Sequence, residues 1–148
     1  MKNVLEVYTD GAAYTEDNVL TWAYIIVRDE RIVHQNCDII YASGKHAPDV
    51  ETAESEAMYQ VIKDHITNHP DNYILYTDSK SLHDKIYDHC NNASKNPHIK
   101  FIQDTLKKFK ESPLPISFQV KWRRRCSNDW MSAVNDLTKK ENFIIGIQ

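Results

Sequence analysis

The chain has 148 residues, of which 41% are hydrophobic and 26% are charged, and its formal net charge is −3. This length and composition are typical of a globular domain with a buried core, and we expect a single domain over residues 1–148. No apolar run approaches the ~20 residues that a membrane-spanning helix needs, so we expect no membrane association. The negative net charge argues against a protein that binds nucleic acid through bulk positive charge alone.

The cysteines and the first residues bear on the compartment. Cys37, Cys90 and Cys126 are odd in number, far apart, and show no C-x-x-C spacing. This pattern indicates free thiols in a reducing environment rather than a disulfide framework or a zinc site. A strand is predicted almost from the first residue, with no secretory signal before it. We therefore expect a cytoplasmic protein.

Hydrophobic periodicity predicts elements in the order β-β-β-α-β-α-α-β-α. The strands are expected at residues 4–10, 20–27, 31–40, 73–78 and 116–122, with a hairpin at Asp29-Glu30. The helices are expected at residues 52–69, 79–90, 98–110 and 129–140. This order predicts an α/β fold in which helices pack on a five-stranded mixed sheet.

The tripeptide Tyr-Thr-Asp occurs twice, and each copy closes a predicted strand. The two copies end in Asp10 and Asp78. Open α/β sheets bind ligands beyond the carboxyl ends of their strands, so the two carboxylates are expected to share a site. Taken singly, each has an ordinary alternative, because Asp10-Gly11 could close a hairpin and Asp78-Ser79 could cap the next helix.

A third acid, Glu54, lies on the apolar stripe of the first predicted helix, three and four residues before Ala57 and Met58. A carboxylate facing the sheet can be buried only beside a cation, and no Lys or Arg at the neighbouring strand ends is an obvious partner. Hard divalent cations prefer carboxylate oxygens. The three acids therefore predict a metal site. Glu56, off this stripe, is expected to be solvated, and Glu51 to precede the helix.

The segments containing these acids resemble the three leading motifs of the type 1 ribonuclease H family, in order and approximate spacing. They are Tyr8-Thr9-Asp10-Gly11-Ala12, Ala53-Glu54-Ser55-Glu56-Ala57 and Tyr76-Thr77-Asp78-Ser79. The order of strands and helices is also that of the family, so the resemblance covers nearly the whole chain. It implies a ribonuclease H-like fold and an endonuclease that hydrolyses the RNA strand of RNA/DNA hybrids with two Mg²⁺ or Mn²⁺ ions. Asp10, Glu54 and Asp78 would be the first three catalytic, metal-binding residues.

The fourth acid of the family lies on the last helix, and here the chain departs from the pattern. The family register puts Asn135 where an Asp is expected. Asp136 is the alternative, because the two residues flank the buried stripe on opposite sides, and a third register puts Ser132 there. We expect Asn135 to be the fourth catalytic and metal-binding residue, with a carbonyl oxygen but no charge to offer.

Substrate contacts are predicted around the metal site. A cationic run, Arg123, Arg124 and Arg125, follows the last strand and is expected to meet phosphates. Further expected contacts come from the backbone of Gly11 and Ala12 and from the hydroxyl of Ser79. The family often carries a histidine in the link before the last helix. Cys126 takes roughly that position, as an idle or buried thiol.

Two other functions fit parts of the pattern. Loss of charge at Asn135 is compatible with a catalytically weak or inactive hybrid-binding protein. A metal-dependent phosphatase could use strand-end aspartates, although Glu54 on a helix and the single Asp at each strand argue against it. The expected partner is an RNA/DNA hybrid, with no obligatory protein partner and a monomeric state.

Overall fold

The sheet has the order β3-β2-β1-β4-β5 in the computed structural model, which describes residues 4–41, 48–88 and 96–144. Its strands are β1 (Leu5–Tyr14), β2 (Val19–Arg28), β3 (Arg31–Tyr41), β4 (Asn72–Thr77) and β5 (Ser117–Trp122). The helices are α1 (Val50–Val61), α2 (Lys80–Tyr87), α3 (Pro97–Glu111), α4 (Asp129–Leu137) and α5 (Glu141–Ile144). A π-helical segment, η1 (Ile62–Ile66), continues α1.

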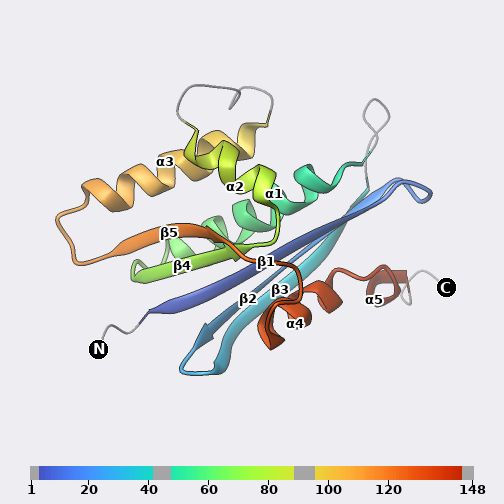
Figure 1. Ribbon diagram of the computed structural model, residues 1–148, viewed down its shortest axis with the longest axis horizontal. Coiled ribbons are helices and arrows are strands. Elements are labelled where there is room, and N and C mark those ends of the chain that lie inside the picture. The colour runs from blue at the N-terminus through green and yellow to red at the C-terminus, as the bar shows by residue number, and fades with distance from the viewer. Residues whose placement is uncertain (1–3, 42–47, 89–95, 145–148) are drawn as a thin grey trace.

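The sheet is mixed, with helices on both faces. β1 pairs antiparallel with β2, and β2 with β3, whereas β1 and β4 and then β4 and β5 pair in parallel. Helices α1, α2 and α3 cover one face, and α4 lies on the other face near β1 and β2 (Figure 1). This architecture confirms the fold class expected from the order of elements.

Alternation along the strands divides the core into two layers. Val7 of β1 packs with the α1–α3 layer, and the next residue, Tyr8, packs with α4. β2 is covered on both faces and is buried except at Arg28. β3 lies at the edge of the sheet and is mostly exposed, so only its inner neighbour carries a continuous apolar run.

Side-chain caps set the starts of the helices. Asp49 accepts a hydrogen bond from the Thr52 N–H at 2.8 Å and starts α1 at Val50, so Glu51 lies within the first turn rather than before the helix. Asn128 accepts from the Met131 N–H at 2.8 Å and starts α4. None of the helices in the described residues is long and apolar enough to cross a membrane.

Three predicted boundaries were wrong. β1 does not end at residue 10 but runs on through Asp10 and Gly11 to Tyr14, so this pair does not close a hairpin. α1 ends at Val61, and the rest of the predicted helix is the π-helical segment and a turn. α4 ends at Leu137, and the short α5 that follows was not predicted. Residues 89 and 90, the predicted end of the second helix, lie outside the described residues.

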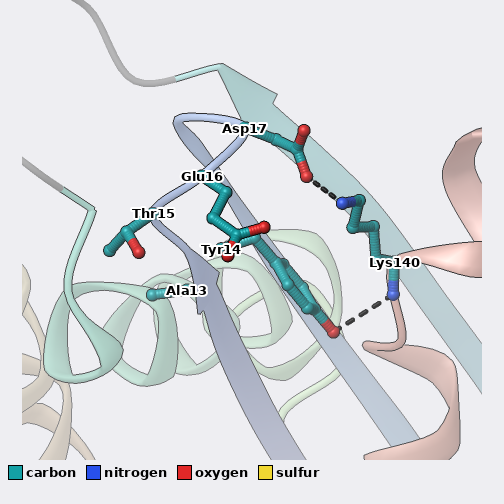
Figure 2. A pocket seen from close by; sticks show the side chains of 6 residues that line it. All are labelled: Ala13, Tyr14, Thr15, Glu16, Asp17 and Lys140. Atoms are coloured by element: carbon teal, nitrogen blue, oxygen red, sulfur yellow. Dashed lines mark hydrogen bonds and ion pairs between the residues drawn. The ribbon is translucent and has the colours of Figure 1, made fainter.

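The C-terminal part of the chain returns to the β1–β2 hairpin. The Lys140 ammonium pairs with the Asp17 carboxylate, and the Tyr14 hydroxyl accepts a hydrogen bond from the Lys140 backbone N–H at 3.1 Å (Figure 2). The same hydroxyl donates to the Thr138 carbonyl oxygen at 3.1 Å. These contacts hold the end of α4 against β1 and β2.

Candidate metal centre

The site lies where β1 outruns its parallel neighbour. β4 pairs with β1 only as far as Tyr76 opposite Tyr8, and β4 then ends at Thr77. Asp10 lies two residues after Tyr8 on β1, and Asp78 is the first residue after β4. Because the two strands are parallel, both aspartates lie at the same end of the sheet, as the sequence predicted.

Glu54 reaches this point because Gly11 lets α1 approach β1 very closely. A Cβ atom at position 11 would lie 2.2 Å from the Ala53 carbonyl carbon and 2.5 Å from the Glu54 nitrogen. No side chain fits in that space. The glycine therefore allows the first turns of α1 to pack on the strand beside Asp10, with Glu54 facing the sheet as its spacing predicted.

Asp10, Glu54 and Asp78 form one group, which we call the acid cluster. Each offers a carboxylate oxygen, and these three oxygens lie within 4.8 Å of one another. Asp10 and Glu54 are 2% and 1% exposed. Within the described part of the chain, no fourth His, Cys, Asp or Glu joins the cluster.

The electrostatics of the acid cluster are those of a site short of positive charge. Burial, and then the neighbouring Asp78 charge, raise the pKa of Asp10 to about 6, although the Gly11 N–H and Arg125 lower it. Burial and the charges of both aspartates raise the pKa of Glu54 well above its ordinary value. One oxygen of each buried acid, Asp10 Oδ1 and Glu54 Oε2, has no hydrogen-bond partner among the described residues.

These features fit a divalent cation. Buried carboxylate oxygens without partners cost free energy, and a hard cation would satisfy them and stabilise their charged form. Because the donor set consists of carboxylate oxygens alone, it suits Mg²⁺ or Mn²⁺ better than a metal that prefers imidazole or thiolate.

Asp78, unlike Glu54, has a cationic partner among the described residues. Arg125 Nε lies 3.2 Å from Asp78 Oδ2. The Arg125 side chain is 63% exposed and that of Asp78 only 7%. The sequence signal was the cationic run itself, but only the fold brings the end of this run back to the end of β4.

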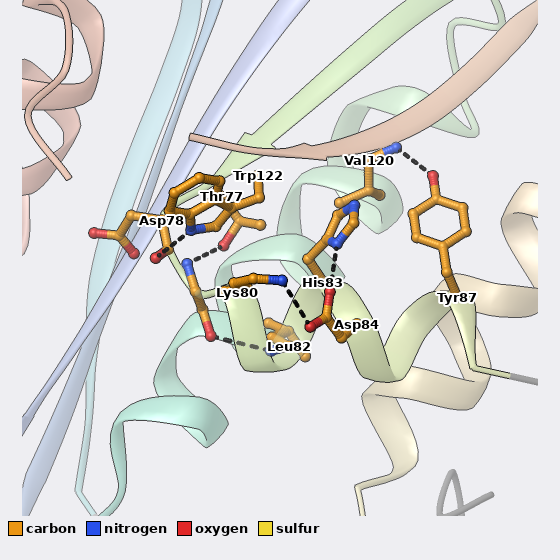
Figure 3. Close-up of polar contacts among 10 residues, drawn as sticks. Thr77, Asp78, Lys80, Leu82, His83, Asp84, Tyr87, Val120 and Trp122 are labelled. Atoms are coloured by element: carbon orange, nitrogen blue, oxygen red, sulfur yellow. Dashed lines mark hydrogen bonds and ion pairs between the residues drawn. The ribbon is translucent and has the colours of Figure 1, made fainter. Parts of the chain in front are cut away.

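The segment around Asp78 is tied in place by hydrogen bonds (Figure 3). The Trp122 indole N–H donates to the Asp78 carbonyl oxygen at 3.2 Å, and the Ser79 N–H donates to Thr77 Oγ1 at 3.1 Å. Ser79 Oγ accepts from the Leu82 N–H and caps α2. The Ser79 hydroxyl, predicted to contact substrate, thus caps a helix in this structure. Ala12 is half-buried on β1 opposite Thr21.

A side chain at the end of α4 contacts the acid cluster, and the sequence reading missed it. The hydroxyl of Thr138, the buried C-cap residue, lies 3.5 Å from Asp10 Oδ2 and 2.7 Å from the Asn135 carbonyl oxygen, to which it donates. Its spacing of seven residues from buried Met131 could have revealed it, because such residues share a helix face.

The three candidates for the fourth ligand differ in their surroundings. Asn135 and Ser132 are half-buried on α4. The Asp136 side chain is 67% exposed, and Asp136 Oδ1 pairs with Lys139 Nζ at 3.0 Å. Asp136 therefore lies outside the acid cluster.

The remaining predicted residues lie in the link from β5 to α4, residues 123–128, which we call the basic link. The Arg123 guanidinium lies 4.7 Å from the centroid of the Tyr76 ring, and Arg124 is exposed. Cys126 is exposed, with a left-handed φ of 53°, so a buried thiol is excluded.

Glu56 on α1 was expected to be solvated but is half-buried. Its Oε1 atom lies 3.0 Å from His98 Nε2.

Comparisons with known proteins agree with this architecture. The family model described as RNase H matches residues 2–139 of the chain. Among the curated proteins, none matches it in sequence.

Several solved structures share the fold at low identity. RNase H1 from the halophilic archaeon Halobacterium salinarum NRC-1 has a TM-score of 0.64 at 17% identity, over 88% of this chain and 93% of that one. LC11-RNase H1 in complex with RNA/DNA hybrid has a TM-score of 0.66 at 16% identity, over 97% of this chain and 98% of that one. The foamy viral protease-reverse transcriptase in complex with RNA/DNA hybrid has a TM-score of 0.67 at 16% identity, over 92% of this chain and 19% of that one.

Proposed function

The chain belongs to the RNase H family, and on this premise we propose that it hydrolyses the RNA strand of RNA/DNA hybrids with divalent cations bound by Asp10, Glu54 and Asp78. The observation that carries the proposal is the pair of buried, unpartnered oxygens, Asp10 Oδ1 and Glu54 Oε2. Two similar structures, LC11-RNase H1 and the foamy viral enzyme, are complexes with RNA/DNA hybrid, which supports this substrate class.

The proposed cofactor is Mg²⁺ or Mn²⁺, as two ions. Such a pair would activate a water and stabilise the leaving oxygen of a phosphodiester. The acid cluster would hold the ions, and Asn135 is proposed as a neutral fourth ligand. The three carboxylates come from β1, α1 and the end of β4, so the fold fixes their mutual positions before a cation binds.

Proposed substrate contacts surround the acid cluster. The backbone at Gly11 and Ala12, beside Glu54, and the start of α2 at Ser79 would face the hybrid, whose 2′-hydroxyls distinguish its RNA strand. The cations of the basic link would contact phosphates.

Replacing Arg123, Arg124 and Arg125 together by Ala should then reduce the slope of log hybrid affinity against log salt concentration by about 0.9 per lost contact. An unchanged slope would assign the basic link to the solvated surface.

A second candidate is a weak or inactive hybrid-binding protein. The observation that favours it is the missing fourth acid: within the described residues the acid cluster has three members, and the neutral Thr138 at the end of α4 lies beside Asp10. Fewer charges hold a hard cation less tightly. This candidate predicts metal-independent binding of hybrid with little or no cleavage.

A labelled hybrid incubated with Mg²⁺ or Mn²⁺ tests both candidates, with single-stranded RNA and double-stranded DNA as controls. Asp10→Asn, Glu54→Gln and Asp78→Asn should each abolish cleavage with the far-ultraviolet circular dichroism unchanged. Glu56→Gln is the matched control for Glu54→Gln, because Glu56 lies on the same helix but pairs with His98. Substantial cleavage by any variant of the acid cluster at saturating metal would remove that residue from the site. Hybrid binding without cleavage by the unmodified protein would favour the second candidate.

A further inference from the structure

Arg125 occupies a position that no predicted role explains. It was expected to face phosphates, but its Nε–H donates to Asp78 Oδ2 at 3.2 Å. Asp78 has a cationic partner, whereas Asp10 and Glu54 each keep a buried oxygen that has no hydrogen-bond partner among the described residues. Within the described part of the chain, the Arg125 guanidinium is therefore the cation that forms an ion pair with the acid cluster.

The basic link presents Arg125 to Asp78 through contacts on both sides. Before it, the Arg123 N–H donates to the Thr77 carbonyl oxygen at 2.8 Å, which extends the pairing of β5 with β4. After it, the Ser127 N–H donates to the Arg124 carbonyl oxygen at 3.2 Å, and Cys126 has a left-handed φ of 53°. These contacts form a tight turn that bends the chain back toward the end of β4.

The Arg125 side chain is fixed at its guanidinium and otherwise exposed to solvent. Its guanidinium contacts a carboxylate that is 7% exposed, but the side chain as a whole is 63% exposed. A partly exposed ion pair of this kind is weak, so its release costs little. A guanidinium is also suited to phosphate, because its planar donors match phosphate oxygens as well as carboxylate oxygens.

We propose that Arg125 is a positioning residue that exchanges between Asp78 and a phosphate of the bound nucleic acid, and thereby couples cation binding to substrate binding. The proposal rests on the proposed function. Without cation or substrate, Arg125 pairs with Asp78 and partly neutralises the acid cluster. When a divalent cation binds the cluster, the cation replaces the guanidinium as the partner of Asp78. Arg125 then contacts a phosphate of the bound nucleic acid.

This exchange predicts opposite effects on two equilibria. In the absence of nucleic acid, Arg125 competes with the cation for Asp78, so its removal should tighten cation binding. With the cation bound, Arg125 is free to hold substrate, so its removal should weaken hybrid binding. Because such coupling is reciprocal, hybrid should raise the affinity for the cation in the unmodified protein more than in a variant without Arg125. If Arg125 had only a structural role, its removal would weaken both cation binding and hybrid binding.

The test begins with calorimetric titration of the whole protein with Mg²⁺ or Mn²⁺ alone. We expect Arg125→Ala to lower the dissociation constant for the cation by about two- to fivefold, the effect of losing one partly exposed ion pair. The dissociation constant of Arg125→Lys should lie between those of Arg125→Ala and the unmodified protein, because lysine keeps the charge but loses the planar donor. Arg124→Ala is the matched control: it removes an adjacent charge that forms no ion pair within the described residues, so its effect should be much smaller.

The second measurement follows the guanidinium directly. In a ¹⁵N-labelled sample, the Nε–H resonance of Arg125, assigned by its loss in Arg125→Lys, should shift as Mg²⁺ saturates the site. At saturating cation, Arg125→Ala should raise the KM for hybrid more than it lowers kcat.

The outcomes separate the two proposals. If the cation binds Arg125→Ala no more tightly than Arg124→Ala, or if the Arg125 resonance does not move, the exchange is wrong and the proposed function stands. If neither Mg²⁺ nor Mn²⁺ binds the unmodified protein, both the exchange and the proposed function are wrong.

Discussion

At the scale of single residues, the most informative group is a carboxyl that is harder to ionise in the folded protein than in the unfolded chain. Burial and the charge of Asp78 raise the pKa of Asp10 from 3.8 to about 6. Between these values the folded protein holds a proton that the unfolded chain has lost. The free energy of unfolding of the metal-free protein should therefore fall as the pH rises through this window, and stay low above it.

Asp10→Asn should remove this pH-dependent loss. Without metal, the variant should unfold with a free energy higher by on the order of 2–3 kcal/mol at pH 7.5 but nearly unchanged at pH 4. Urea titrations with EDTA at the two pH values measure the difference. Asp104→Asn, at an exposed α3 position paired with Lys100, is the control and should have little effect at either pH. Equal stabilisation by Asp10→Asn at both pH values would contradict a raised pKa.

A second prediction at this scale concerns the fourth ligand. Asn135→Asp should lower the metal concentration for half-maximal cleavage, because a carboxylate adds charge to a site that holds a hard cation. Asn135→Ala should raise that concentration or abolish activity. Asp136→Asn should do little, since Asp136 is exposed and paired with Lys139. The reverse pattern, with Asp136→Asn inactive and Asn135→Ala unaffected, would show that the register is wrong by one residue.

At the scale of elements, the site depends on how closely α1 approaches β1. Gly11→Ala would put a methyl group 2.2 Å from the Ala53 carbonyl carbon, so the helix must move. The neighbouring atoms are backbone and cannot rotate away. We expect a loss of about 1–3 kcal/mol in the free energy of unfolding and weaker metal binding, because Glu54 moves with the helix.

Thermal unfolding with and without Mg²⁺ measures both effects of Gly11→Ala. Ala12→Ser is the control, because it adds one atom at the next position, on the opposite face of the same strand. If Gly11→Ala unfolds like the unmodified protein and binds metal equally well, the close approach of α1 does not position Glu54.

The sequence predicted most elements, because their patterns are local. Glu54 lies three and four residues before Ala57 and Met58, and this helical spacing put it on the inner side of α1, where the structure has it. The reading failed where long-range contacts decide. The Asp10-Gly11 pair has the composition of a turn, but pairing with β2 keeps it extended as far as Tyr14.

The site residues divide in the same way. Asp10 and Asp78 each follow an apolar, β-rich run, and Glu54 lies on a helical stripe, so the convergence of the three acids could be predicted. The Arg125 contact with Asp78 spans 47 residues, and the Thr138 contact with Asp10 spans 128. Neither has a local signal, because each depends on where the chain returns after β5 and α4.

At the scale of the whole molecule, the first strand and the end of α4 meet beside the acid cluster. β1 supplies Asp10 near the N-terminus, and α4 crosses β1 and β2 near the C-terminus (Figure 1). Thr138 joins them, since its carbonyl oxygen accepts hydrogen bonds from Thr21 Oγ1 at 2.6 Å and from the Tyr14 hydroxyl at 3.1 Å. The geometry at Asp10 therefore depends on the docking of α4, as well as on the strand that carries it.

Tyr14→Phe tests this dependence, because it removes only the hydroxyl that links the β1–β2 hairpin to Thr138 and Lys140. The loss of two hydrogen bonds should lower the free energy of unfolding by about 1–3 kcal/mol, or the melting temperature by roughly 2–4 °C per kcal/mol. Because the other contacts of α4 with β1 and β2 remain, the fold should persist while the helix opens more often.

Amide hydrogen exchange resolved by segment provides the measurement for Tyr14→Phe. We expect protection to fall in α4 and at the end of β1, with β4 and α3 unchanged, and the metal concentration for half-maximal cleavage to rise because Thr138 no longer holds its position beside Asp10. Tyr41→Phe, at a position 62% exposed on the edge strand β3, is the control. A uniform loss of protection across the sheet would instead mean that the hairpin contact stabilises the whole domain and has no special connection to the acid cluster.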